Sequence, residues 1–395
     1  MNLARKGIYM SIASTGGGLL MLAAYAVVAR IVPKAAFGEY QVAGTFASIA
    51  ALAAYPNMPA ALVTAAARKA YGTFPLAAAA VFRRARYGMI GLLATAVYYA
   101  VTGRYGLATA IAVSIPFFAP SAISGFYEAY CVGTGSVRAY AAHSLGASFA
   151  AASAFVIAGL VFPAYAAPLV FAISCAGAAT TGLWAYRAST SPVAQSGTVS
   201  YEALSFGKKT SWIESVAWTA NYADILLLNA FLEPREVAVY GIARIAPEAI
   251  KGLVKNLGVL SAARIAIMEK GAVRKMLTSR LIQATLIAFA CALAYVLAAP
   301  TFFRLVFPIY PEAAPFSQLL AISFLAFPAH LAESALDGLL HKKGSIILTG
   351  AGTSTIFIFS LILIPPLGIL GAVSARILAR FANAVIALWL VWRLI

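Results

Sequence analysis

Apolar stretches about as long as a membrane-crossing helix recur along this whole chain, and they limit its fold more than any other feature. A helix needs about 20 predominantly apolar residues to cross the hydrocarbon core of a bilayer. Twelve such stretches can be recognised, at 8–29, 40–66, 87–102, 107–130, 140–161, 165–186, 210–232, 237–263, 281–299, 314–339, 345–364 and 368–392. We therefore predict an all-α polytopic membrane protein with about twelve transmembrane helices.

The composition excludes the common soluble classes. Of the 395 residues, 62% are hydrophobic and only 10% are charged. A soluble domain is about half apolar and about a quarter charged, because it must cover its surface with polar groups. A soluble enzyme, a nucleic-acid binder and a disordered chain are therefore set aside, and membrane lipids become the expected surroundings.

The chain divides into two halves of similar design. The polar segment 187–209, rich in Ser, Thr and Gly, is predicted to be a cytoplasmic linker between an N-terminal six-helix bundle, 1–186, and a C-terminal one, 210–395. The segment ARIVPKAAFGEYQVA at 29–43 aligns without gaps onto NAFLEPREVAVYGIA at 229–243. An offset of about half the chain is typical of a parallel internal repeat, so we predict two pseudo-symmetric bundles around a central cavity.

The basic residues predict the orientation. The net charge of +17 could suggest a nucleic-acid partner, but Lys and Arg collect in the cytoplasmic loops of membrane proteins. With the N-terminus placed inside, the inner loops hold 19 basic residues and the outer loops hold 5. This distribution predicts that both termini are cytoplasmic, in the inner membrane, and it explains most of the charge without nucleic acid.

Ionisable side chains lie within the predicted spans, where exposure of each one to lipid would cost about 2.5–3.5 kcal/mol. Those of the second half are Glu214, Asp224, Arg244, Glu248, Lys251, Lys255, His330, Glu333, Asp337, Arg376 and Arg380. Within a span they recur every three or four residues, so each helix presents a polar face. We expect these faces to line a water-filled cavity between the two halves. The alternative is a dry ion-pair network that only holds the helices together.

The first half is less polar. Glu128 shares a helix face with Ser121 and Ser124 and is its clearest candidate for a functional acid. The glycine run 16–18 would loosen the first helix or, as we favour, let a neighbouring helix pack closely.

These residue types favour transport over catalysis. Arg and Lys recognise phosphate groups directly, and buried carboxyl groups can take up a coupling ion, H⁺ or Na⁺. The sequence has no convincing catalytic, metal-binding or nucleotide-binding motif, so we expect neither an enzyme nor a resident cofactor. The pattern fits an ion-coupled transporter that works by alternating access.

Four segments carry a resemblance to a known family: ARIVPKAAFGEYQVAGTFASIAAL at 29–52, NYADILLLNAFLEPREVAVYGIA at 221–243, FPIYPEAAPFSQLLAIS at 307–323 and IPPLGILGAVSARILAR at 364–380. In order and spacing they resemble the polysaccharide or O-antigen flippases of the multidrug/oligosaccharidyl-lipid/polysaccharide exporter superfamily. The resemblance implies movement of an undecaprenyl-pyrophosphate-linked oligosaccharide from the cytoplasmic to the periplasmic leaflet. It would also imply a polysaccharide polymerase or glycosyltransferases as partners.

The resemblance also implies roles for the intramembrane residues. Substrate binding would fall to Arg244, Lys251, Lys255, Arg376 and Arg380, and ion coupling to Asp224, Glu333, Asp337, Glu128 and Glu248. Two alternatives from the same superfamily stay open, a multidrug/cation antiporter and a lipid II flippase. A membrane-embedded enzyme such as a polymerase and a non-transporting assembly partner are the alternatives from other classes.

Overall fold

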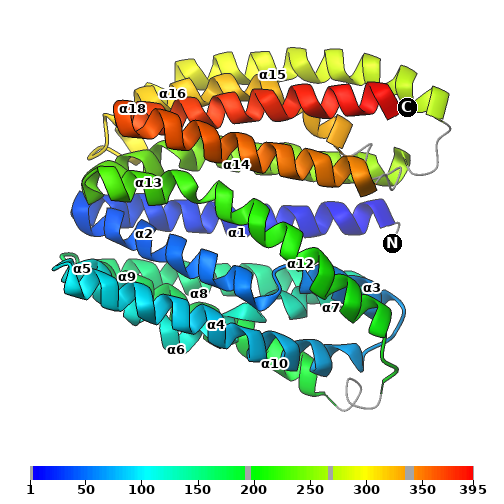
Figure 1. Cartoon of the computed structure of the whole chain (residues 1–395), viewed down its shortest axis with the longest axis horizontal. Helices are drawn as coiled ribbons and strands as arrows, with labels where there is room; N and C mark the ends of the chain where they lie inside the picture. The colour runs from blue at the N-terminus through cyan, green and yellow to red at the C-terminus, as the bar shows by residue number, and fades with distance from the viewer. Residues whose placement is uncertain (1–2, 192–196, 266–269, 334–341, 395) are drawn as a thin grey trace. The chain divides into compact units, whose positions relative to one another are not determined.

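The computed structural model is helical throughout the part of the chain that it describes (Figure 1). It describes the backbone of residues 3–191, 197–265, 270–333 and 342–394; within these ranges, side chains are described except at 3–8, 11, 213, 217, 252–265, 270–279, 342–346 and 394. Each predicted span falls on helix with at most short breaks, and residues 334–339 of the tenth lie outside the described ranges.

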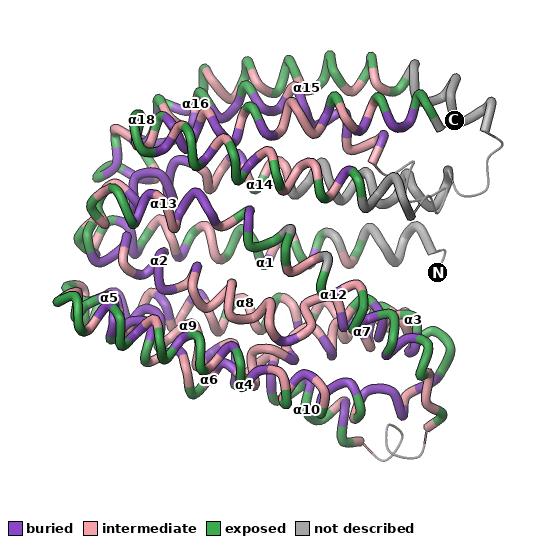
Figure 2. Tube along the Cα trace, viewed as in Figure 1, coloured by how far each residue is buried: buried purple, intermediate pink, exposed green. Residues whose placement is uncertain are grey.

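The apolar surface of the helices confirms a polytopic membrane protein. By length and hydropathy, six helices among the described residues could cross a bilayer, and two bent helix pairs raise the number to eight. Large apolar side chains on α15 (Lys270–Val306) are exposed, among them Leu286, Phe289 and Leu297. In Figure 2 the described part of α15 is coloured mostly as exposed or intermediate. A water-soluble protein would bury such a face, whereas lipid solvates it.

The chain separates into two compact units, residues 1–219 and 220–395. The N-terminal unit contains α1 (Leu3–Ile31), α2 (Lys34–Ala51), η1 (Leu52–Ala54), α3 (Met58–Ala67), α4 (Thr73–Val101), α5 (Tyr105–Ala112), α6 (Ile115–Ala122), α7 (Gly125–Thr134), α8 (Val137–Val161), α9 (Ala166–Gly177), the π-helical turn η2 (Ala178–Gly182), α10 (Leu183–Thr190) and most of α12 (Tyr201–Asn221).

Two spans of the N-terminal unit are bent at breaks next to proline. The helix pair α2–η1 and α3 bends by 52° around Pro56, and the pair formed by α5 and α6–α7 bends by 43° just before Pro116. Proline lacks the backbone N–H that a continuing helix needs, which explains where the breaks fall.

The glycine run serves close packing, as we favoured. α1 continues unbroken through residues 16–18 and packs along α8. A Cβ atom on Gly17 would lie 2.5 Å from Ser148 Oγ, and one on Gly16 would lie 3.1 Å from the Leu145 side chain. Larger residues would push the two helices apart.

The beginning of α12 is bound to the N-terminal unit. The Ser200 N–H donates to Thr73 Oγ1 at 2.8 Å, and Arg68 pairs with Glu202 at 3.0 Å. Further along, Ser211 Oγ accepts from the Asn57 N–H at 3.1 Å, and Ser215 Oγ donates to the Leu52 carbonyl at 2.9 Å. The two serines thus satisfy backbone groups that the break between η1 and α3 leaves free.

The C-terminal unit contains α13 (Ala223–Phe231), α14 (Pro234–Ile265), α15, α16 (Ala313–Ala321), the 3₁₀ segment η3 (Ile322–Ala329) and α18 (Lys342–Leu394). α18 comprises two helices that meet at a kink at Gly368, which has φ 57° and ψ −127°. The kink separates the last two predicted spans.

The helix boundaries support the internal repeat. In the N-terminal unit α1 ends at Ile31 and α2 begins at Lys34, and in the C-terminal unit α13 ends at Phe231 and α14 begins at Pro234. Both boundaries are offset by 200 residues, as in the sequence alignment.

Candidate functional site

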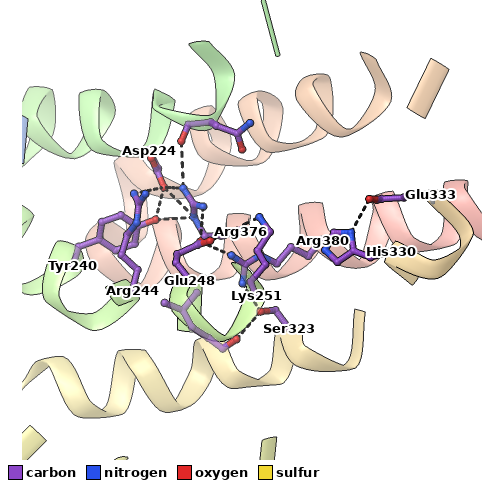
Figure 3. A network of polar contacts seen from close by, with 12 residues as sticks. Asp224, Tyr240, Arg244, Glu248, Lys251, Ser323, His330, Glu333, Arg376 and Arg380 are labelled. Atoms are coloured by element: carbon purple, nitrogen blue, oxygen red, sulfur yellow. Dashed lines mark hydrogen bonds and ion pairs between the residues drawn. The ribbon is translucent and has the colours of Figure 1, made fainter. Parts of the chain in front are cut away.

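A cluster of charged side chains in the C-terminal unit brings together three helices (Figure 3). α13 contributes Asp224, α14 contributes Arg244, Glu248 and Lys251, and the second half of α18 contributes Arg376 and Arg380. On α14 and α18 the residues stand three or four positions apart, so each helix presents its charges on one face. We call these six residues the charge cluster.

The innermost contact of the charge cluster joins Asp224 to Arg376. The exposed fractions of their side chains are 1% and 5%. Arg376 Nε lies 3.1 Å from Asp224 Oδ2, and its Nη2 also pairs with that oxygen. The Tyr240 hydroxyl donates to Asp224 as well, and the Ile225 N–H donates to the other carboxylate oxygen at 2.8 Å. A buried carboxylate with this many donors is well compensated.

Glu248 links Arg376 to two other bases of the charge cluster. Its Oε1 accepts from Arg376 Nη1 at 2.9 Å and also pairs with Arg380 Nη2. Its Oε2 lies 3.7 Å from Lys251 Nζ. Arg380 also donates to Ser323 Oγ at 2.6 Å. One carboxylate therefore serves three bases on two helices.

The outer side of the charge cluster is partly exposed. The side chains of Arg244, Glu248 and Lys251 are 21%, 27% and 30% exposed. Arg244 Nη1 is buried, lies 3.5 Å from Asp224 Oδ2 and has no hydrogen-bond partner among the described residues. With two acids against four bases, the charge cluster has a net formal charge of +2.

A second polar group lies beside the charge cluster. His330 Nδ1 lies 2.6 Å from Glu333 Oε2, and Asn383 Nδ2 donates to Glu333 Oε1 at 2.8 Å. The Phe327 ring stacks on His330 with a centroid separation of 6.0 Å, and Arg380 Cζ lies 5.6 Å from the same ring. Phe327 therefore contacts both groups.

The structure thus answers part of the question left open between a wet cavity and a dry network. Asp224 and Arg376 form the dry pair of the alternative interpretation, because both are buried and bonded to each other. Arg244, Glu248 and Lys251 keep partial exposure, as a site for a polar ligand requires. The charge cluster is an ion-pair network with one accessible side.

The remaining predicted site residues lie elsewhere or outside the description. Glu128 lies on α7 in the N-terminal unit, is half-buried and has no ion pair among the side chains that the structure describes. The Lys255 side chain and all of Asp337 lie outside the described residues. Glu333 pairs with His330 rather than with the charge cluster.

Two residues that contact the charge cluster, Tyr240 and Ser323, were not predicted from the sequence. Tyr240 contacts both Asp224 and Arg376, and it stands four residues before Arg244, so its helical spacing could have included it in the stripe. Ser323 bonds Arg380 from η3, and nothing in its local sequence distinguishes it from other serines.

A pocket in the N-terminal unit differs from the charge cluster because no charged residue lines it. It has a volume of about 340 Å³, and uncharged residues line it, including Phe82, Phe117 and Cys175. It offers no charged group to a phosphate, so the charge cluster is the better candidate for an ionic ligand.

No family model and no curated protein matches the chain, but solved structures do. A lipid II flippase, MurJ, in an inward closed conformation matches 97% of this chain and 87% of its own, with a TM-score of 0.71 and 11% identity. An outward-facing multidrug resistance MATE family transporter of the MOP superfamily matches 99% and 94%, with a TM-score of 0.63 and 14% identity. The chain has the fold of these transporters.

A third similar structure is a MOP superfamily transporter from Pyrococcus furiosus, described by a reverse polarity of its binding pocket that suggests a different function. It matches 98% of this chain and 95% of its own, with a TM-score of 0.57 and 16% identity. At such low identity these matches establish the fold alone.

Proposed function

We propose that this protein is a flippase that moves an undecaprenyl-pyrophosphate-linked oligosaccharide, the repeat unit of an O-antigen or another surface polysaccharide, from the cytoplasmic to the periplasmic leaflet. The observation that carries the proposal is the net charge of +2 on the partly exposed charge cluster. A pyrophosphate bears negative charge and needs several N–H donors, which guanidinium groups supply in a matching geometry.

The charges divide into supporting and ligand-binding groups in this proposal. Arg244 and Lys251 would meet the pyrophosphate, because their side chains are the most exposed of the four bases of the charge cluster. Arg376 and Arg380 would hold the cluster together and add positive potential. Glu248 and Asp224 would be the candidates for coupling to H⁺ or Na⁺, since both link helices through ion pairs that protonation would weaken.

The similar structures favour transport of a lipid or of a drug. One of them is named as a lipid II flippase, so this fold serves lipid translocation. Another is described by a reverse polarity of its binding pocket, so pocket charge can differ between proteins of this fold. A multidrug/cation antiporter is the second candidate, because MATE transporters match over nearly the whole chain.

Reconstitution tests the proposal. Proteoliposomes would contain a short-chain polyprenyl-pyrophosphate-linked disaccharide with a fluorescent label, and translocation would be measured as protection of the label from an impermeant quencher. We expect the double variant Arg244→Gln, Lys251→Gln to translocate at least about tenfold more slowly, since each lost charge-assisted hydrogen bond is worth about 1.5–3 kcal/mol. Arg304→Gln is the control, because Arg304 is exposed on α15 and forms no ion pair with the side chains that the structure describes.

A second arm separates the two candidate functions. The same proteoliposomes would be offered a fluorescent organic cation under a proton or sodium gradient. Uptake of the cation with no movement of the glycolipid would contradict the flippase and favour the antiporter. Equal rates for the double variant and Arg304→Gln would remove the charge cluster from the mechanism.

A further inference from the structure

Arg84 on α4, in the N-terminal unit, contacts aromatic rings from two other elements. Its Cζ lies 4.9 Å from the centroid of the Tyr55 ring and 5.3 Å from that of the Trp212 ring. Its Nε lies 3.2 Å from the Tyr55 hydroxyl and donates to it. Tyr55 follows η1 and Trp212 lies on α12, so aromatic rings from two other elements contact the guanidinium.

The charge of Arg84 is not neutralised. Among the side chains that the structure describes, no carboxylate pairs with Arg84, and only its Nε forms a hydrogen bond. The neighbouring bases add to the positive potential, because Arg83 and Arg86 on α4 and Lys208 and Lys209 on α12 are all exposed. Rings that stack on the guanidinium leave its two terminal nitrogens free to donate in the plane.

The outward face of α4 places Arg84 at a membrane boundary. After the three bases, the exposed residues of α4 are apolar or aromatic, beginning with Tyr87 and Ile90 and reaching Val101. An abrupt change from exposed bases to an exposed apolar face is expected where a helix enters the hydrocarbon core.

α12 also has exposed bases followed by exposed apolar residues, and the aromatic residues Tyr201 and Phe206 before its bases are exposed as well. Lys208 and Lys209 are exposed, and they are followed by exposed Trp212 and Val216. Arg84 contacts Trp212 directly, so the two helices place the boundary at one depth. Trp and Tyr are typical of the headgroup level, where their rings meet apolar tails and their polar atoms meet water.

The backbone around Tyr55 holds its ring in place. Tyr55 has φ 58° and ψ 69°, a left-handed conformation that a residue with a Cβ adopts only at a cost. The hydrogen bonds from α12 to Leu52 and Asn57 secure the break on either side of it. Strain maintained by surrounding contacts is often associated with a functional position.

We propose that Arg84, together with Tyr55 and Trp212, binds the phosphate of an anionic phospholipid at the cytoplasmic boundary of the membrane. The terminal nitrogens of Arg84 donate to the phosphate oxygens, and the two rings contact the glycerol and the first methylenes. The exposed bases nearby favour an anionic lipid over a zwitterionic one. The site is distinct from the charge cluster, which lies in the other unit.

Lipid binding to the full-length protein tests this site. The protein would be purified in a neutral detergent and titrated with phosphatidylglycerol, phosphatidylcholine or inorganic phosphate, and bound adducts would be counted by native mass spectrometry. We expect preferential retention of phosphatidylglycerol and about tenfold weaker retention in Arg84→Gln. Arg83→Gln is the matched control, because Arg83 is the adjacent base, is exposed and makes no cation–π contact with the described aromatic rings.

Two further variants distinguish the contribution of the aromatic rings to lipid binding from an effect on folding. Trp212→Leu should weaken phosphatidylglycerol binding, whereas Tyr55→Phe, which keeps the ring, should bind it within about threefold of the wild type. Unchanged helicity and elution volume would show that each variant is folded. Equal losses in Arg84→Gln and Arg83→Gln would overturn the specific site, and binding of inorganic phosphate as tightly as phosphatidylglycerol would overturn the assignment to a lipid.

Discussion

Glu248 is the acid that pairs with three of the four bases in the charge cluster. One of its oxygens serves Arg376 and Arg380, and the other faces Lys251. A phosphate that entered the cluster would offer the same bases the same kind of acceptor. Glu248 therefore acts as an internal anion that a ligand must compete with, provided that the charge cluster is the substrate site.

This competition gives a prediction at the residue scale. Glu248→Gln should lower the free energy of unfolding by about 3 kcal/mol, because it leaves bases without their counter-charge. Inorganic pyrophosphate should then raise the thermal midpoint of this variant more than that of the wild type, since binding to the native state stabilises it by mass action. The measurement is a thermal scan in detergent with and without pyrophosphate.

Glu202→Gln serves as the control for this scan. Glu202 forms an exposed ion pair with Arg68 in the N-terminal unit, and exposed pairs contribute little to stability. Its pyrophosphate response should match the wild type. If Glu248→Gln shows no larger response than this control, Glu248 does not compete with anions.

At the scale of the elements, prolines and glycines constrain the backbone of α18 around its kink. Pro365 and Pro366 precede the kink, and each lacks a backbone N–H for helix continuation. Gly368 takes a positive φ there, and a Cβ on Gly371 would lie 2.0 Å from the Leu363 carbonyl oxygen. The second half of α18 carries Arg376 and Arg380, so the kink sets the direction from which these arginines approach α14.

We therefore predict that Gly371→Ala destabilises the protein strongly, by about 3 kcal/mol or more, because the backbone must move to admit the methyl group. Gly350→Ala in the same helix is the control, since a Cβ there meets nothing within 4 Å, and it should be neutral or stabilising by up to about 1 kcal/mol. Denaturant unfolding in detergent, followed by circular dichroism, measures both. Similar stabilities for the two variants would contradict the tight packing at the kink.

At the scale of the whole molecule, the distribution of Lys and Arg predicts the orientation in the membrane. Tyr105 lies at the start of α5, in a predicted outer loop, and Lys209 lies near the start of α12, in the predicted cytoplasmic segment; both are exposed. In a variant without the three native cysteines, Tyr105→Cys should react with an impermeant maleimide on intact cells. Lys209→Cys should react only after permeabilisation, and the reverse pattern would invert the topology.

The helices could largely be predicted from sequence because apolar stretches and prolines act locally. The predicted boundary between spans at 364 and 368 coincides with the kink, and the gapless alignment at an offset of 200 recurs in the helix ends at Ile31 and Phe231. The packing of Gly17 against Ser148 needed the structure to confirm it, since a glycine run by itself is compatible with close packing or with a loosened helix.

The residue types and helical spacing of the charge cluster were also readable from sequence, because a period of three to four residues places side chains on one face of a helix. Their pairing was not. Arg376 binds an aspartate 152 residues away, and the same arginine could have paired with any of several acids in the unit. Tertiary packing decided that Asp224 and Arg376 are dry while Arg244 and Lys251 remain partly exposed, because burial and ion-pair distances depend on which helices meet and at what depth.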